Sequence, residues 1–392
     1  MNDQFVPFHR AYLSGHEAGY LAESLASGHF DHKGLFLKKC AVQLSRITGA
    51  KNLVLTPSCT AALEMAALLC DIQQGDEVVM PSFTFVSTAN PFVLRGARVV
   101  FADIDPRTMN IDPDCVEAAI TEKTKALVCT HYGGVAADLE KCMSLAEKHG
   151  LLVVEDAAHG IGATWQGRHL GTIGHLGALS FHSTKNIHCA EGGALLVNDP
   201  SLVERAHWLR DKGTNRSQFM SGQVDQYTWV DVGSSFTLAE LNAAFLSAQL
   251  QDLATVNAQR LQIWQLYHEQ LAALAEAGCI ELARLPDHTG HNAHVFFIKC
   301  QNRSERTALT RYLSARGVEA LFHYVPLHTA PAGMRYGRFS GQDLYSTADS
   351  ERLLRLPVYP GLADAAVRRI AELVHSFYAS IIVSQHARPA LL

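Results

Sequence analysis

The sequence has no long apolar run, no excess of positive charge and no export signal. No stretch reaches the roughly 20 apolar residues that a membrane-spanning helix needs, and residues 1–11 lack the apolar core of a signal peptide. The net charge is −5 with neutral histidines, so we expect no broad basic surface for nucleic acid. We predict no membrane insertion, no nucleic-acid partner and a cytoplasmic location.

Paired cysteines and metal-binding histidine patterns are also missing. The nine cysteines are scattered without a CxxC pair, and the twenty histidines form no HxxxH or HExxH pattern. Closely spaced Cys or His residues mark most zinc sites, and disulfides are rare in reducing compartments. The sequence therefore predicts reduced thiols and no metal site.

The composition is that of a globular protein large enough for two domains. The 392 residues are 48% hydrophobic and 18% charged. Short apolar segments alternate with helices such as Cys59–Leu69 and Leu139–His149, which is typical of a parallel sheet covered on both faces. We predict an α/β domain over residues 1–250 with a mostly parallel seven-stranded sheet, its strands at Asn52–Leu55, Glu77–Met80, Val99–Ala102, Ala126–Thr130, Leu151–Glu155, Leu179–Phe181 and Gly193–Val197.

The C-terminal part has a different pattern. Residues 237–277 are rich in Ala, Leu and Gln, which predicts a long helix that leaves the large domain. The segments after it indicate a smaller α+β domain over residues 251–392. We predict strands at His294–Lys299 and Glu319–His323, and helices at Arg306–Arg316, Ser350–Leu354 and Asp364–Ser380.

A lysine just beyond a strand is the first candidate for chemistry. Ligands of such sheets bind at the C-terminal ends of the strands, and Lys185 follows one of them. A lysine there can form an imine with an aldehyde cofactor, although most single lysines are surface residues. Asp156 ends another strand, where its carboxylate can pair with a protonated pyridine nitrogen or simply cap a turn. The two residues together favour the chemical interpretation.

Residues suited to a phosphate and a planar ring follow other strands. Ser58 precedes the predicted helix Cys59–Leu69, whose free N–H groups and dipole can hold a phosphate, or Ser58 is a plain N-cap. Ser180 precedes Lys185 by five residues and can bond the same phosphate, or is an ordinary strand residue. Phe83 or Phe85 can stack on a ring, although such aromatics are more often core residues.

Four longer stretches carry a specific resemblance. They are TPSCTAALEMAALL at 56–69, PSFTFVSTAN at 81–90, KGTNRSQF at 212–219 and SERLLRLP at 350–357. On these stretches the chain resembles the DegT/DnrJ/EryC1/StrS sugar aminotransferases over nearly its whole length, and among them those that make dTDP-4-amino-4,6-dideoxy-D-galactose. The resemblance implies the aspartate-aminotransferase fold (fold type I of the transferases that use pyridoxal 5′-phosphate, PLP) and a homodimer with shared active sites.

The same resemblance implies a cofactor site. PLP would be held as a Schiff base on Lys185, with Asp156 at its ring nitrogen and His159 near its phenolic oxygen. Phe85 would stack on the ring. The phosphate would be held by Cys59, Thr60, Ser180 and, from the neighbouring subunit, Ser235, which stands where many members of the family have Asn.

Candidate substrate residues are cationic or polar. The diphosphate of a nucleotide-linked sugar needs cations, and each cation considered is otherwise an ordinary surface residue. Two further candidates lie in the segment HYVPLH at 323–328, which matches the family and either reaches the sugar or closes the domain interface. The six candidates are Lys33, Lys212, Asn215, Arg216, His323 and Tyr324.

The predicted reaction is a two-step transamination that feeds lipopolysaccharide or another cell-surface polysaccharide. L-Glutamate would give its amino group to PLP, and the group would pass to dTDP-4-dehydro-6-deoxy-D-glucose to give dTDP-4-amino-4,6-dideoxy-D-galactose. Three alternatives stay open: amination at C3 of an isomeric keto sugar, a UDP-linked sugar, and a non-catalytic regulator that senses a nucleotide sugar. Relatives that dehydrate the sugar carry His in place of the lysine, so Lys185 argues against dehydration.

Overall fold

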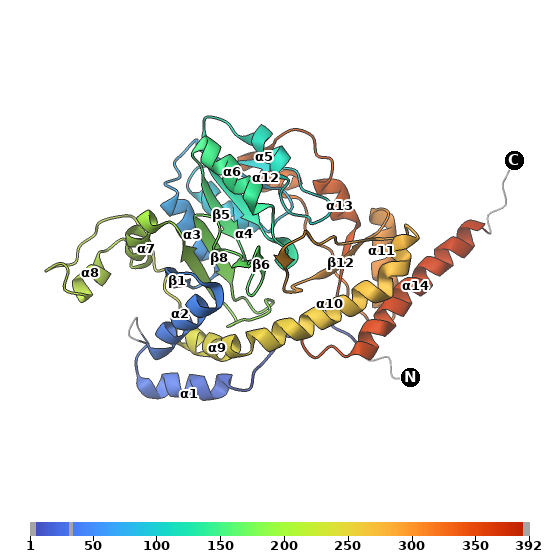
Figure 1. Ribbon diagram of the computed structural model, residues 1–392, viewed down its shortest axis with the longest axis horizontal. Helices are drawn as coiled ribbons and strands as arrows, with labels where there is room; N and C mark the ends of the chain where they lie inside the picture. The colour runs from blue at the N-terminus through green and yellow to red at the C-terminus, as the bar shows by residue number, and fades with distance from the viewer. Residues whose placement is uncertain (1–4, 31–33, 387–392) are drawn as a thin grey trace.

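An eight-stranded sheet organises the chain (Figure 1). The computed structural model describes residues 5–30 and 34–386. The strand order is β1-β9-β8-β5-β4-β2-β3-β13, and every neighbouring pair is parallel except that β9 runs antiparallel to β1 and β8. The strands are β1 (Leu53–Thr56), β2 (Glu77–Pro81), β3 (Arg98–Ala102), β4 (Thr124–Thr130), β5 (Leu152–Asp156), β8 (Leu176–Ser180), β9 (Gly193–Val197) and β13 (Gly337–Phe339).

All seven predicted strands are present, each within three residues of its predicted ends. The predicted α/β fold with a mostly parallel sheet is confirmed, but the sheet has an eighth strand, β13. This strand lies in the predicted C-terminal domain and pairs with β3, with Gly337 opposite Val99. A Cβ atom at Gly337 would lie 2.6 Å from Phe101 Cε2, so the close approach requires glycine. Because β13 has only three residues and no apolar run, no pattern in the sequence indicates this strand. The predicted boundary between two domains at residue 250 stays a prediction.

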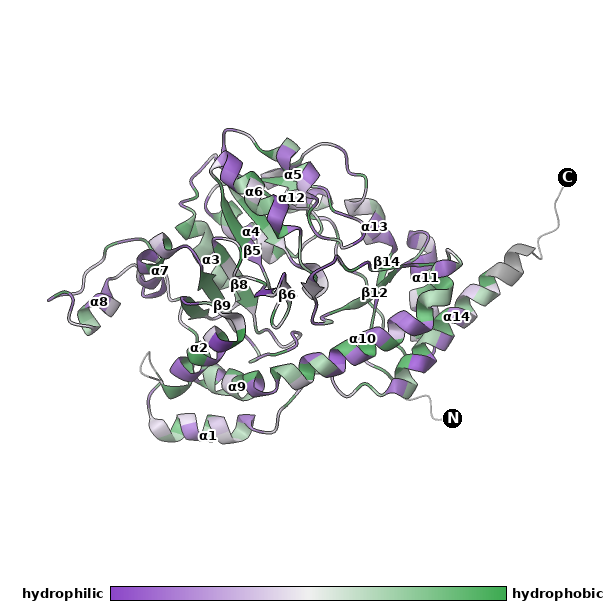
Figure 2. Ribbon diagram, in the orientation of Figure 1, coloured by the Kyte–Doolittle hydropathy of each residue, from purple (hydrophilic) through white to green (hydrophobic). Residues whose placement is uncertain are grey.

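Helices cover both faces of the sheet because successive strand residues point to opposite sides. One apolar core lies between the sheet and α2 (Leu35–Thr48), α5 (Pro113–Ala119), α6 (Leu139–His149) and α9 (Glu240–Gln251). The other lies under α3 (Cys59–Leu69), α4 (Val86–Leu94) and α7 (Val203–Arg210). Figure 2 shows the strands as the most hydrophobic part of the chain. Helix α1 (Glu17–Ser27) packs on α9.

Helix α10 (Leu253–Glu276) runs from beneath the sheet to the C-terminal part (Figure 1). The single long helix predicted here is two helices, α9 and α10, which meet at Asp252. In the C-terminal part, α10, α11 (Arg303–Ser314) and α14 (Asp364–His386) enclose a third apolar core with a small antiparallel sheet. That sheet has the order β10 (Glu281–Leu282), β12 (Phe296–Lys299), β14 (Leu353–Leu356).

Two predictions for the C-terminal part are wrong. The predicted strand Glu319–His323 forms only an isolated bridge between Leu321 and Arg355. The predicted helix Ser350–Leu354 is the end of α13 (Ser346–Arg352) followed by β14. The leucines of β14 are buried and pair with β12, so tertiary burial decides the conformation against local helix propensity.

Short elements complete the fold. They are β6 (Thr164–Trp165), β7 (Arg168–His169), β11 (Thr289–Gly290), α8 (Arg216–Met220) and α12 (Pro331–Tyr336). In the described part of the chain, no helix combines the length and apolarity needed to cross a bilayer. The same residues contain no cluster of three potential metal ligands.

Candidate active site

A cavity of about 760 Å³ lies at the C-terminal ends of the strands, between the large sheet and the C-terminal part. Residues that follow β1, β2, β5 and β8 form one wall, and residues 321–325 and β14 form the other. This is where a ligand of a parallel sheet is expected. The predicted site residues that line it are Cys59, Thr60, Phe85, Asp156, His159, Ser180, Lys185, His323 and Tyr324.

Lys185 lies in the loop after β8, where its backbone N–H donates to the carbonyl of His182 (2.9 Å). Burial lowers the pKa of its amine, and this outweighs the opposite effects of Cys59 and Asp156. A lower pKa leaves a larger fraction of the amine uncharged at neutral pH. The lysine is therefore suited to attack an aldehyde or to take up a proton.

Asp156 ends β5 and is almost fully buried. Thr88 Oγ1 donates to one carboxylate oxygen (2.7 Å), and the backbone N–H of Ala158 donates to the other (3.2 Å). Because the Thr88 proton is committed to Asp156, Thr84 Oγ1 donates to Thr88 (2.7 Å) and Thr130 donates to Thr84 (3.2 Å). Three hydroxyl groups thus point their protons toward the carboxylate, and this chain fixes the position of the Asp156 side chain.

The N-terminus of α3 opens into the same cavity. Ser58 is the N-cap and accepts a hydrogen bond from Ala61 N–H (3.1 Å), which leaves the N–H groups at Cys59 and Thr60 without an intrahelical partner. Strand β9 passes very close: a Cβ atom at Gly193 would lie 2.5 Å from Cys59 N. Free N–H groups at the positive end of a helix make a site for a phosphate.

Two stacked histidines line the cavity, with ring centres 4.1 Å apart. Gly133 N–H donates to His159 Nδ1 (3.2 Å), so the neutral ring carries its proton on Nε2. Burial, and then the charge of Lys185, lower the pKa of His159 well below its usual value, which keeps the ring neutral. His294 Nδ1 is held by the side-chain oxygen of Asn186 (2.9 Å). His159 Nε2 can therefore donate to an oxygen in the cavity.

Aromatic residues from both walls face each other across the cavity. Phe85 is 56% exposed and faces Tyr324 with ring centres 6.2 Å apart. Phe83 is fully buried against Tyr132. Phe83 is therefore a core residue, and Phe85 is the aromatic residue that can stack on a ring in the cavity. His323 Nδ1 lies 3.2 Å from the hydroxyl of Tyr132. The cavity thus offers a flat apolar surface beside the polar groups.

Four predicted site residues of the described chain do not line this cavity. Lys212, Asn215, Arg216 and Ser235 belong to the segment 211–235, which projects from the body of the molecule around α8 (Figure 1). The side chain of Asn215 accepts a hydrogen bond from Thr228 N–H (2.7 Å), and Ser235 is exposed. Lys33 lies outside the described residues.

Sequence reasoning missed three residues that line the cavity, Arg260, His294 and Arg355. It also missed Thr88, whose hydroxyl donates to Asp156. Thr88 could have been found, because it follows Phe85 by three residues and so shares a helix face with it. The other three come from α10, the segment before β12, and β14. Their sequence distance from Lys185 gave no signal, since only the packing of the C-terminal part brings them to the site.

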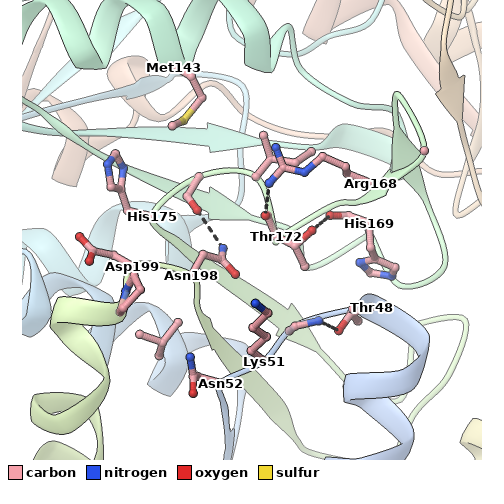
Figure 3. Close-up of a pocket in the computed structure, with 17 residues that line it drawn as sticks. Thr48, Lys51, Asn52, Met143, Arg168, His169, Thr172, His175, Asn198 and Asp199 are labelled. Atoms are coloured by element: carbon pink, nitrogen blue, oxygen red, sulfur yellow. Dashed lines mark hydrogen bonds between the residues drawn. The ribbon is translucent and has the colours of Figure 1, made fainter.

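A second cavity, of about 670 Å³, lies elsewhere on the large sheet and is lined by Lys51, Arg168 and His175 among others (Figure 3). Asn198 Nδ2 donates to the carbonyls of Gly171 (2.9 Å) and Gly174 (2.8 Å), and so fixes the loop between β7 and β8. This second cavity contains none of the predicted site residues. We attribute a structural role to the hydrogen bonds of Asn198.

The fold and the first cavity define a class of protein: an α/β enzyme with a lysine, a buried carboxylate and an anion cradle at the edge of a parallel sheet. A sequence model described as the DegT/DnrJ/EryC1/StrS aminotransferase family matches residues 12–375. The chain belongs to this family, and it is therefore an aminotransferase. The predicted membership of this family is confirmed.

Solved structures of similar chains agree. The aminotransferase TlmJ from Streptoalloteichus hindustanus has 30% sequence identity and a TM-score of 0.86, over 96% of this chain and 98% of that chain. DesV of S. venezuelae has 30% identity and a TM-score of 0.84, over 93% and 94% of the two chains. Spr1654 from Streptococcus pneumoniae, in its PLP form, has 24% identity and a TM-score of 0.86, over 96% of this chain and 100% of that chain. The predicted PLP-dependent type I fold is confirmed.

Proposed function

We propose that the protein is a PLP-dependent aminotransferase that puts an amino group on a nucleotide-linked keto sugar. One observation carries the proposal: Lys185, Asp156 and the N-terminus of α3 meet in one cavity. The chain fits the cofactor at each point. Lys185 has a lowered pKa, and a chain of three hydroxyl groups ends at the carboxylate of Asp156. Position 193 has no room for a side chain beside the N-terminus of α3, so only glycine fits there.

The residues have separate tasks in this proposal. PLP, when bound, supplies the electron sink that lets an amino acid lose its α-proton. Asp156 would accept a hydrogen bond from the protonated ring nitrogen, and His159 Nε2 would donate to the phenolic oxygen. The N–H groups of Cys59 and Thr60, with the Ser180 hydroxyl, would hold the phosphate. Lys185 Nζ would anchor the cofactor until the amine of the donor displaces it, and the freed lysine amine would then take up the proton of the donor's α-carbon.

The substrate is inferred from the four matching stretches. We propose L-glutamate as amino donor and dTDP-4-dehydro-6-deoxy-D-glucose as acceptor, giving dTDP-4-amino-4,6-dideoxy-D-galactose for a surface polysaccharide. The test is incubation with L-glutamate and either this sugar or its 3-keto isomer. Turnover of the 3-keto isomer alone would refute amination at C4. Turnover of a UDP-linked sugar alone would refute dTDP as the nucleotide of the substrate.

We further propose a homodimer in which each subunit completes the other's site. The projecting segment 211–235 carries exposed apolar side chains that a monomer would leave in water: Phe219, Met220, Tyr227, Trp229, Val230 and Val232. It also carries Lys212, Arg216 and Ser235, which do not line the cavity of their own chain.

We also propose that the enzyme is cytoplasmic. All nine cysteines are free thiols, as is usual in a reducing compartment.

Borohydride trapping tests the proposed function. After incubation with PLP and reduction, we expect one covalent adduct, on Lys185, identified by peptide mass spectrometry. Lys185→Ala should give none, whereas Lys148→Ala, which removes an exposed lysine paired with Glu117, should still be labelled at Lys185. Absence of an adduct, or an adduct on other lysines only, would overturn the proposal and leave a sensor of nucleotide sugars as the alternative.

A further inference from the structure

Arg355 is a buried cation at the cavity with unused hydrogen-bond donors. It lies on β14, is 9% exposed and lines the cavity. Its Nη2 donates to the carbonyl of Phe322 (3.1 Å), and its guanidinium carbon lies 4.6 Å from the ring centre of Phe8. Its Nε is buried without a partner. A guanidinium has five N–H donors, so most of its hydrogen-bonding capacity is free.

The strand directs this side chain toward the reaction centre. Leu354 and Leu356 point into the core of the C-terminal part, so Arg355, which lies between them, points to the other side. Across the small sheet Arg355 pairs with Phe297, which packs in the cluster with Phe83, Tyr132 and Tyr324. Its charge lies near enough to Lys185 to contribute to the lowered pKa of that amine.

No carboxylate of the described residues forms an ion pair with Arg355. Burying an unpaired charge is unfavourable, so a cation retained in a cavity is suited to an anion that arrives with a ligand. The other arginine at the cavity is already engaged. Arg260 donates to the carbonyls of Ala293 (3.1 Å) and His294 (2.6 Å), and so positions that segment.

Covalent chemistry decides which anion fits. In an amino acid the α-carboxylate is bonded to the carbon that loses its proton, so its receptor must lie beside Lys185. In a nucleotide-linked sugar the diphosphate is attached at C1, across the ring from a C4 carbonyl. Arg355 lines the same cavity as Lys185, so its guanidinium suits the carboxylate better than the diphosphate.

We propose that Arg355 binds the α-carboxylate of the amino donor and thereby selects an amino acid rather than a simple amine. The inference rests on the proposed function and concerns only its first half-reaction. A guanidinium suits a carboxylate because both are planar and can form two parallel hydrogen bonds. The sugar has no charge near its keto carbon, so Arg355 has no charge to pair with there in the second half-reaction.

The test separates the two half-reactions in Arg355→Gln and Arg355→Lys. The first is followed as the loss of the visible cofactor absorption when L-glutamate is added in a single turnover. The second starts from enzyme loaded with pyridoxamine phosphate and is followed as the return of that absorption on addition of the keto sugar. We expect Arg355→Gln to lower the efficiency of the glutamate step by about 10- to 150-fold, as for loss of a hydrogen bond to a charged group. The sugar step should change by less than about threefold, and Arg355→Lys should be intermediate.

A comparison of donors supplies a second measurement. Wild-type enzyme should strongly prefer L-glutamate to 4-aminobutanoate, which lacks the α-carboxylate, and Arg355→Gln should lose most of that preference. Arg168→Gln, in the second cavity (Figure 3), is the matched control and should behave as wild type.

An unchanged glutamate step in Arg355→Gln, or equal losses in both steps, would overturn the role of Arg355. Should Arg355→Gln fail to retain PLP, the donor preference of Arg355→Lys decides: a preference equal to that of wild type overturns the proposal. If the proposed function itself is wrong, wild-type enzyme shows no visible cofactor absorption, which separates the two failures.

Discussion

Replacement of Thr88 by valine tests the hydroxyl chain that supports Asp156. Valine keeps the shape of the fully buried threonine but removes the 2.7 Å hydrogen bond to the carboxylate. A hydrogen bond to a charged group contributes about 1.5–3 kcal/mol, and Thr84 loses its acceptor as well. We expect Thr88→Val to lower the free energy of unfolding of the cofactor-free protein by about 2–3 kcal/mol, measured by urea denaturation.

Two matched variants separate charge support from packing. Thr130→Val removes only a 3.2 Å bond between neutral hydroxyls and should cost about 1 kcal/mol or less. Thr88→Ser keeps the donor and loses one buried methyl group, which costs about 1 kcal/mol. The reasoning is refuted if Thr88→Val is no less stable than Thr130→Val, or if Thr88→Ser destabilises as much as Thr88→Val.

Two further predictions concern the small sheet and the projecting segment. Burial raises the pKa of Glu281, but hydrogen bonds from Arg352 and Lys299 outweigh it and lower the pKa to about 2 from 4.5. Because the side chain is half exposed, the pair contributes about 1 kcal/mol or less; this stability is present above pH 4.5 and lost as the pH falls through about 2. Glu281→Gln should therefore be less stable than wild type at neutral pH and equal to it near pH 2, and equal stability at neutral pH would contradict this. Trp229 is 75% exposed in the projecting segment. Trp229→Ser should weaken the proposed dimer by at least about 30-fold in sedimentation equilibrium, whereas the control Met334→Ser should leave the dimer unchanged. A wild-type protein that is monomeric at micromolar concentration would exclude the dimer.

The sequence could predict the large sheet because its signals are local. Each strand is a short apolar segment, and Ser58 precedes an alanine- and leucine-rich helix that it caps. Strand β13 has no such pattern, and the segment Glu319–His323, predicted as a strand, forms only a bridge at Leu321. Their conformation depends on partners far along the chain, as with Gly337, whose missing side chain lets β13 approach Phe101.

The amino-acid sequence alone determined the family and the approximate positions of seven strands, and it singled out Lys185 and Asp156 as candidates, because these depend on neighbours in the chain and on long matching stretches. Only the tertiary structure decided that Thr88 supports Asp156, that His159 stacks on His294, and that Arg355 reaches the cavity. The physical reason is that these contacts join segments far apart in the sequence. Burial and charge at such a site are properties of the packed chain, and no local pattern encodes them.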